Sequence, residues 1–146
     1  PWPASPHRLT DMPPAPLRDI VAHLDTLLRT PEIPDYPGAV NGLQLENSGA
    51  VARVAVAVDW SRAAVEGAVA AGAQLLVVHH GMFWGGAQPM VGPAYAKLRA
   101  CLAADLAVYA SHLPLDCHPT HGNNALLARE LGLEPSGGFH RYKTVD

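Results

Sequence analysis

Three short apolar runs alternate along the chain with segments of helical spacing, and this alternation is the feature that most constrains the fold. The runs are 51–58 (VARVAVAV), 74–78 (QLLVV) and 106–110 (LAVYA), and the helical segments that follow them are 61–71, 94–104 and 125–131. The runs lack the polar alternation of half-exposed strands, which is typical of strands covered on both faces in a parallel sheet. The sequence therefore predicts an α/β fold, with a mostly parallel sheet and helices on both faces.

An amphipathic helix and a proline-rich segment precede the first of these strands. Apolar residues recur at helical spacing from Leu17 to Leu28, and the pattern stops before Pro31. Residues 31–50 hold three prolines and three glycines, which predicts an ordered loop or short edge strands. For the last helix, Asn123 or Asn124 is the expected N-cap, and Gly132 lies just past its end.

The length of 146 residues fits a single domain. Residues 1–11 (PWPASPHRLTD) lack the apolar stretch of a secretory signal. We interpret residues 1–15 as a disordered segment, either a leader or a misassigned start. Residues 16–146 then form one α/β lobe. Its last residues, 140–146 (HRYKTVD), have the character of a strand that is cut off, so the lobe looks truncated.

Composition excludes several classes of protein. Hydrophobic residues make up 49% and charged residues 16% of the chain, which does not fit a disordered protein, and no apolar run approaches the ~18 residues of a membrane span. A net charge of −3 gives no electrostatic footprint for nucleic acid. Cys101 and Cys117 are too few for a disulfide scaffold, so we expect free thiols and a cytoplasmic location. Neither a P-loop nor a GxSxG elbow is present.

Polar side chains stand where each predicted strand ends. The second strand ends in His79 and His80, the third leads into His112 and then Asp116, and the first ends in Asp59. Ligands of open parallel sheets bind at the carboxyl ends of the strands, so these residues converge where chemistry is expected. We predict that His79, His80 and Asp116 bind divalent metal, and that His112 is a ligand, a supporting residue or an acid–base group.

Each of these residues also has a purely structural interpretation. One of the paired histidines can bond a backbone carbonyl while the other is solvated, and His112 can be a core histidine. Asp116 can belong to a turn. For Asp59 we expect a cap on the following helix rather than a metal ligand.

For the other polar and aromatic residues near the strand ends we expect structural rather than functional roles. We expect Cys117, His118 and His121 to be solvated, although His121 can approach the site. Phe83 and Trp84 are expected to cover the sheet edge. The residues 41–44 (NGLQ) are expected to form a turn only.

Five motifs in a fixed order resemble one known family. They are 41–44 (NGLQ), Asp59 after a valine-rich strand, 77–83 (VVHHGMF), 111–116 (SHLPLD) and 122–128 (GNNALLA). Together they resemble the NGG-interacting-factor-like family, also known as dinuclear metal center proteins or GTP cyclohydrolase 1 type 2 proteins. The resemblance covers Leu17 to Phe139.

This resemblance implies a fold of two similar lobes, of which the chain would be the first, assembled as a ring-shaped homohexamer. It implies two divalent ions in a cleft between the lobes, without choosing among zinc, iron and manganese. His79, His80 and Asp116 match the family's metal residues, and His112 matches a histidine beside the site. The family also has an HxxxE element near its C-terminus, and the 146 residues contain none.

Two functions follow as expectations. The first is a metal-dependent hydrolase of the GTP cyclohydrolase 1 type 2 kind, with His112 as its catalytic residue and a small molecule as its substrate. The second is a metal-binding or scaffold protein without turnover. The missing HxxxE element favours the second function.

Overall fold

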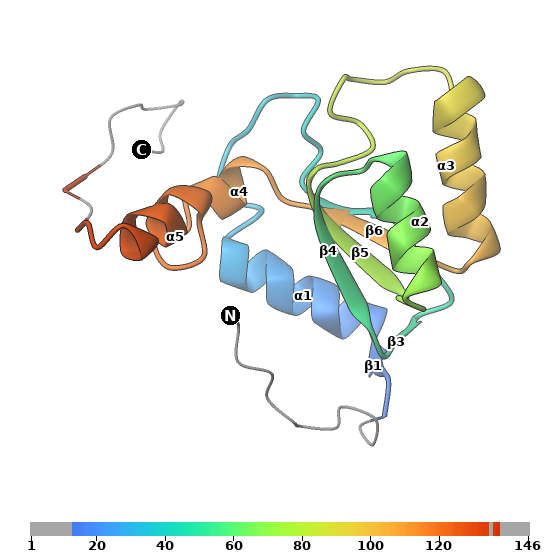
Figure 1. Cartoon of the computed structure of the whole chain (residues 1–146), viewed down its shortest axis with the longest axis horizontal. Helices are drawn as coiled ribbons and strands as arrows, with labels where there is room; N and C mark the ends of the chain where they lie inside the picture. Colours follow the sequence, from blue (N-terminus) through green and yellow to red (C-terminus); the bar gives the residue numbers. More distant parts are fainter. Residues whose placement is uncertain (1–12, 135, 138–146) are drawn as a thin grey trace.

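The computed structural model of the chain describes residues 13–134, 136 and 137 (Figure 1). Its main sheet has the strand order β2-β6-β5-β4, formed by β2 (Gly42–Leu45), β4 (Val54–Asp59), β5 (Leu75–His80) and β6 (Ala107–Ala110). Strands β4, β5 and β6 are parallel, and β2 is antiparallel to β6. A small antiparallel pair joins β1 (Ala15–Pro16) to β3 (Ala50–Val51). The predicted mostly parallel α/β sheet is thus confirmed.

Helices cover both faces of this sheet. The helices are α1 (Leu17–Leu28), α2 (Arg62–Ala70), α3 (Gly92–Ala103), α4 (Leu113–Asp116) and α5 (Asn123–Glu130). Helices α2 and α3 lie on one face and α1 on the other, while α4 and α5 lie beyond the carboxyl ends of the strands (Figure 1). None of the helices within the described residues is long and apolar enough to cross a lipid bilayer.

Most predicted elements are present with small shifts of their bounds. The run 51–58 is divided between β3 and β4, and the loop 31–50 contains the edge strand β2. The expected asparagine cap of α5 is wrong, because Gly122 holds the N-cap position and Asn123 lies inside the helix. The leader and the strand expected at 140–146 lie outside the described residues, except for residues 13–15.

Two hydrophobic clusters hold the helices against the sheet. On the α2–α3 face the cluster consists of Trp60, Val65, Ala68, Ala73, Leu76, Val78, Cys101, Leu106, Val108 and Ala110. On the α1 face it consists of Leu17, Leu28, Val51, Leu75, Ala107 and Tyr109. Strands β5 and β6 contribute to both clusters, so they are the covered centre of the sheet.

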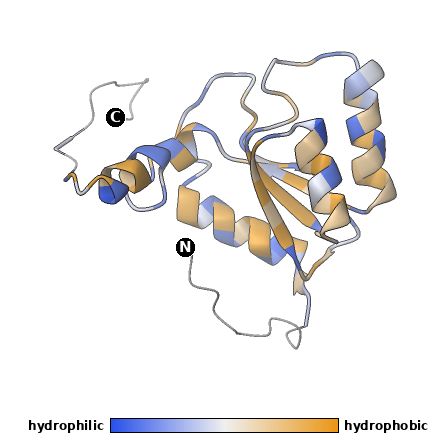
Figure 2. Cartoon of the chain, in the orientation of Figure 1, coloured by the Kyte–Doolittle hydropathy of each residue, from blue (hydrophilic) through white to orange (hydrophobic). Residues whose placement is uncertain are grey.

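Strand β4 is bare on the α1 face, contrary to the expectation that both of its faces are covered. Helix α1 packs over β5 and β6 and leaves Val56 and Val58 exposed at 80% and 63%. The apolar colouring of β4 and α1 is visible in Figure 2. Between them lies an apolar groove of about 340 Å³, lined among others by Leu24 and Leu27, that extends to His79.

Tyr109 anchors α1 and the following loop to the central strand β6. Its side chain is fully buried, and its hydroxyl donates to Asp25 Oδ1 at 2.8 Å and lies 3.0 Å from Thr30 Oγ1. Burial raises the pKa of the Tyr109 phenol, and so does the neighbouring Asp25. The neutral phenol therefore links α1 to the sheet.

Tyr109→Phe is expected to lower the free energy of unfolding by about 1–3 kcal/mol, because Asp25 and Thr30 lose their buried partner. Urea denaturation measures this loss. Tyr95→Phe is the matched control, since Tyr95 is 55% exposed and should change stability by no more than about 0.5 kcal/mol. Equal effects of the two substitutions would contradict the anchoring role of Tyr109.

Candidate metal centre

The parallel pairing of β5 with β6 brings the candidate residues together. The register pairs Val78 with Ala110, so the residues that follow them leave the sheet side by side. His79 and His80 are the last residues of β5, and His112 comes two residues after β6. Helix α4 begins immediately after His112 and ends with Asp116.

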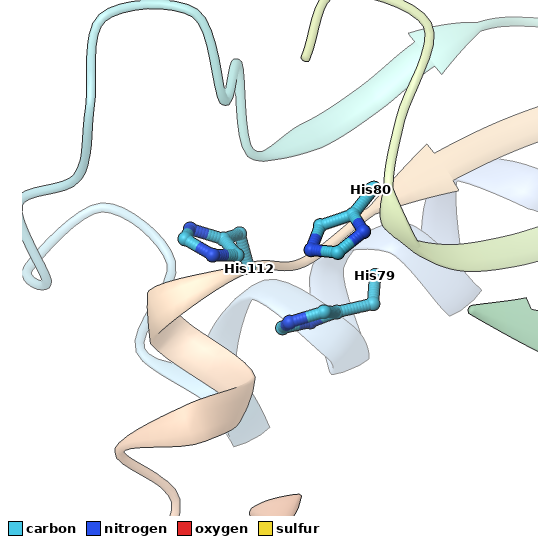
Figure 3. Close-up of side chains that lie close together, drawn as sticks. All are labelled: His79, His80 and His112. Carbon is cyan, nitrogen blue, oxygen red and sulfur yellow. The ribbon is translucent and has the colours of Figure 1, made fainter. Parts of the chain in front are cut away.

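The three histidines form one cluster at this edge. One ring nitrogen of each lies within 4.8 Å of a ring nitrogen of the others. The ring centroids are 4.6 Å apart for His79 and His80, 4.8 Å for His79 and His112, and 5.6 Å for His80 and His112. Figure 3 shows the rings coming from two strand ends toward a common space. Three imidazoles this close can hold a divalent metal ion.

The Nδ1 atom of each histidine faces an oxygen. His79 Nδ1 is 2.9 Å from the Ser111 carbonyl, His80 Nδ1 is 2.8 Å from Asp59 Oδ1, and His112 Nδ1 is 2.9 Å from Asp35 Oδ1. A carbonyl or carboxylate oxygen only accepts, so Nδ1 carries the proton in each bond. In the neutral rings the Nε2 lone pairs are then available, which is the arrangement of metal-binding histidines.

Asp116 lies at the side of the cluster. Its Oδ2 atom is 3.6 Å from Nε2 of His79, and its Oδ1 atom accepts a hydrogen bond of 2.7 Å from the Asn123 side chain. The carboxylate is thus oriented by α5 and has one oxygen facing His79. The donor set near Nε2 of His79 therefore includes a hard oxygen as well as imidazole nitrogens.

Asp35 is a residue of this site that the sequence prediction missed. It lies in the loop before β2, its side chain is only 6% exposed, and both of its oxygens lie near His112 Nδ1. Burial alone would raise the pKa of Asp35. Hydrogen bonds from Asn41, from His112 and from the backbone N–H groups of Leu113 and Tyr36 outweigh burial and hold that pKa below 3.8. A buried carboxylate thus stays charged beside His112.

The expectation for Asp59 is wrong, whereas Trp84 covers the sheet edge as expected. Asp59 does not cap α2, because it bonds His80, and the Ser61 hydroxyl accepts the capping bond from the Ala64 N–H instead. Trp84 covers the histidines, with ring centroids 4.6 Å from His80 and 4.3 Å from His112.

The histidines of the following loop are not members of the cluster, although His121 lines the same groove as His79. His118 and His121 contact each other at 4.6 Å, and both lie outside the group of three histidines found among the described residues. Desolvation, followed by the neighbouring His121, lowers the pKa of His118. Cys117 is half-buried rather than solvated.

Comparison with known proteins gives a consistent result. A sequence model of the Duf34/NIF3 family (NGG1p interacting factor 3) matches residues 15–144. The chain is 46% identical over 123 residues to a "GTP cyclohydrolase 1 type 2 homolog" of Treponema pallidum, covering 84% of the chain and 43% of that relative. It is 43% identical to a relative of the same description in Escherichia coli, over 75% of the chain and 44% of the relative.

Solved structures share the fold. The crystal structure of TTHA1606 from Thermus thermophilus has a TM-score of 0.77 and 40% identity, covering 82% of this chain and 49% of that one. Reduced HcgD from Methanocaldococcus jannaschii, at 24% identity and a TM-score of 0.71, shows likeness of fold alone. The chain spans about half the length of the relatives that it matches.

Asp35→Asn is expected to destabilise the protein at neutral pH, because the amide cannot replace a charged acceptor of several hydrogen bonds. The folded-state pKa of Asp35 is lowered, so its contribution is complete above pH 3.8 and is lost as the pH falls further. The stability difference between wild type and variant should therefore shrink below about pH 4.

Denaturant unfolding at a series of pH values measures this difference. Asp19→Asn is the control, because the Asp19 side chain is 62% exposed and forms a hydrogen bond with the exposed side chain of its neighbour Arg18. A stability difference for Asp35→Asn that stays constant from pH 7 to pH 3 would show that the charge of Asp35 does not matter.

Proposed function

Because the chain belongs to the Duf34/NIF3 family, we propose that it binds divalent metal at the carboxyl ends of β5 and β6 and acts as a metal-dependent hydrolase. The observation that carries this proposal is the cluster of His79, His80 and His112, each with Nδ1 bonded to an oxygen. Such bonds select the tautomer that a metal ion needs. The names of the bacterial and archaeal relatives point to the GTP cyclohydrolase 1 type 2 kind of hydrolase.

Within this proposal, His79, His80 and Asp116 hold the metal. The 3.6 Å between Asp116 Oδ2 and His79 Nε2 supports a shared ligand role for the two side chains. A bound divalent ion supplies a Lewis acid and lowers the pKa of water bound to it. Zinc, iron and manganese all accept imidazole and carboxylate ligands, so this donor set suits each of them.

His112 is the proposed catalytic residue, and its role is to hold or move a proton beside the metal ligands. The charged Asp35 carboxylate accepts a hydrogen bond from Nδ1 of His112 and so orients its ring. Pairing with a buried carboxylate occurs in metal ligands and in general bases alike, so metal analysis of a His112 variant separates the two roles.

The function of the complete protein involves more residues than the 146 of this chain. The relatives are about twice as long as the segment they share with it. We propose that the complete protein binds two divalent ions, with an HxxxE element completing the set of ligands. We also propose that it is a cytoplasmic homohexamer that acts on a small-molecule substrate. The second candidate function is metal binding without turnover.

Metal analysis tests the site directly. After dialysis against Zn²⁺ or Mn²⁺, wild-type protein should retain metal, and His80→Ala and Asp116→Ala should weaken binding by more than the roughly 10–100-fold typical of changes outside the ligand set. His23→Ala is the control, since His23 is exposed on α1. Full metal content in either ligand variant would show that the ligands are assigned wrongly.

Turnover of GTP with Mn²⁺, Fe²⁺ or Zn²⁺ tests the activity. His112→Ala should keep its metal and lose roughly 10²–10⁴-fold in rate, as expected for an acid–base residue. Loss of metal in this variant would make His112 a ligand instead. A metal-loaded wild type that does not hydrolyse GTP would contradict the proposed hydrolase activity on GTP and favour binding without turnover.

A further inference from the structure

The residues 41–44, expected to be only a turn, contact both segments that carry the histidine cluster. We propose that Asn41 and Gln44 are positioning residues that fix the geometry of His80 and His112 before metal binds. This inference rests on the proposed metal-binding function. The hydrogen bonds of these two side chains go to Asp35 and to backbone groups.

Asn41 holds His112 in two ways. Its Oδ1 atom accepts a hydrogen bond of 2.7 Å from the His112 backbone N–H, and its Nδ2 atom donates at 2.8 Å to Asp35 Oδ2. Asp35 in turn accepts from the ring of His112 and from the Leu113 backbone N–H. One amide thus fixes both the backbone at His112 and the carboxylate that orients its imidazole.

Gln44 holds the segment that follows His80. Its Oε1 atom accepts a hydrogen bond of 2.6 Å from the Met82 backbone N–H, and its Nε2 atom donates to the carbonyls of Ala39 and Val40 at 3.2 and 2.8 Å. Gly81 lies directly against the Gln44 amide, and a Cβ atom at Gly81 would also come within 2.7 Å of Ala110 Cβ. The turn after His80 is therefore pressed between Gln44 and β6.

Asn41 and Gln44 can perform these tasks together because they lie on one edge strand. Asn41 comes directly before β2 and Gln44 lies within it, and β2 pairs with β6 through Gly42 and Ala110. Beyond Val78 and Ala110 the ladder between β5 and β6 ends, so His79, His80 and His112 lie outside its last pair. Metal sites need their ligands held by surrounding hydrogen bonds, and β2 supplies these bonds here.

The chain offers matched controls at the opposite end of the same sheet. Asn47 donates to the carbonyls of Gln74 and Asp105 and accepts from the Gly49 N–H. Gln74 accepts from two backbone N–H groups, those of Ala52 and Arg53, and donates to the Gly72 carbonyl. Each control side chain makes as many hydrogen bonds to the rest of the fold as its counterpart, or more, but far from the histidines.

Cobalt titration followed by visible absorption is the test. Gln44→Ala should raise the Kd for Co²⁺ by roughly 10–100-fold and change the absorption band of the bound ion, because Gln44 holds the segment that follows the proposed ligand His80, whereas Asn47→Ala and Gln74→Ala should leave the Kd within about two-fold. Asn41→Ala acts on His112, which lies outside the proposed ligand set, so its Kd should also stay within about two-fold and its effect should appear at the His112 ring. Thermal unfolding of the metal-free variants shows whether the losses of stability are comparable. Unchanged Co²⁺ binding in Gln44→Ala, or equal weakening in the controls, would overturn the positioning role of Gln44.

A measurement on metal-free protein separates this inference from the proposed function. The nitrogen chemical shifts of the His112 ring should show the Nδ1–H tautomer in wild type and a mixture of tautomers in Asn41→Ala. An unchanged tautomer would contradict the positioning role whether or not wild type binds Co²⁺. Absence of Co²⁺ binding by wild type would contradict only the metal-binding function.

Two conservative variants keep the test valid if an alanine variant does not fold. Gln44→Glu keeps the acceptor for the Met82 N–H, so its Co²⁺ affinity should lie closer to wild type than that of Gln44→Met, which lacks the acceptor. Asn41→Asp keeps the acceptor for the His112 N–H but places a second carboxylate beside Asp35. It should therefore disturb the His112 tautomer, and a wild-type spectrum would count against the inference.

Discussion

The parallel pairing of β5 with β6 is the interaction on which the rest of the structure depends. These two strands carry the side chains that pack on both faces, including Leu75, Leu76, Val108 and Tyr109, all essentially inaccessible to water. Because parallel neighbours end at the same edge, this apolar pairing also decides where the polar residues after each strand meet. The register in which β5 and β6 pair therefore determines both the core and the position of the candidate site.

Around the histidines, the surrounding fold supplies each acceptor from a different element. Ser111 belongs to the segment after β6, Asp59 ends β4, and Asp35 lies in the loop before β2. The site is thus supported from three sides, and its geometry depends on the relative placement of β4, β6 and the loop.

The sequence predicted those parts of the structure that depend on periodicity and strand order. The three strand–helix units and the meeting of His79, His80 and His112 follow from apolar runs and from residues directly after them. Asp35 was missed because it lies in a loop of 31–41, where no periodicity assigns a direction to a side chain. The sequence predicted that Asp59 caps α2, but Asp59 bonds His80 instead. This bond depends on the register that pairs Asp59 with His80 across β4 and β5, which the sequence does not show. The sequence signal that could have identified Asp35 is an acidic residue in a short segment between two prolines, Pro34 and Pro37.

The bare valines of β4 have a consequence for the electrostatics of the histidine cluster. The groove that they line extends to His79, so the same hollow borders hydrocarbon on one side and an imidazole on the other. A molecule or segment that fills the groove is stabilised by roughly 25 cal/mol for each Å² of apolar surface that it buries. It also removes the water that screens charges near His79. Apolar contact in this groove would therefore also strengthen the electrostatic interactions of His79, although the contact itself involves no charged group.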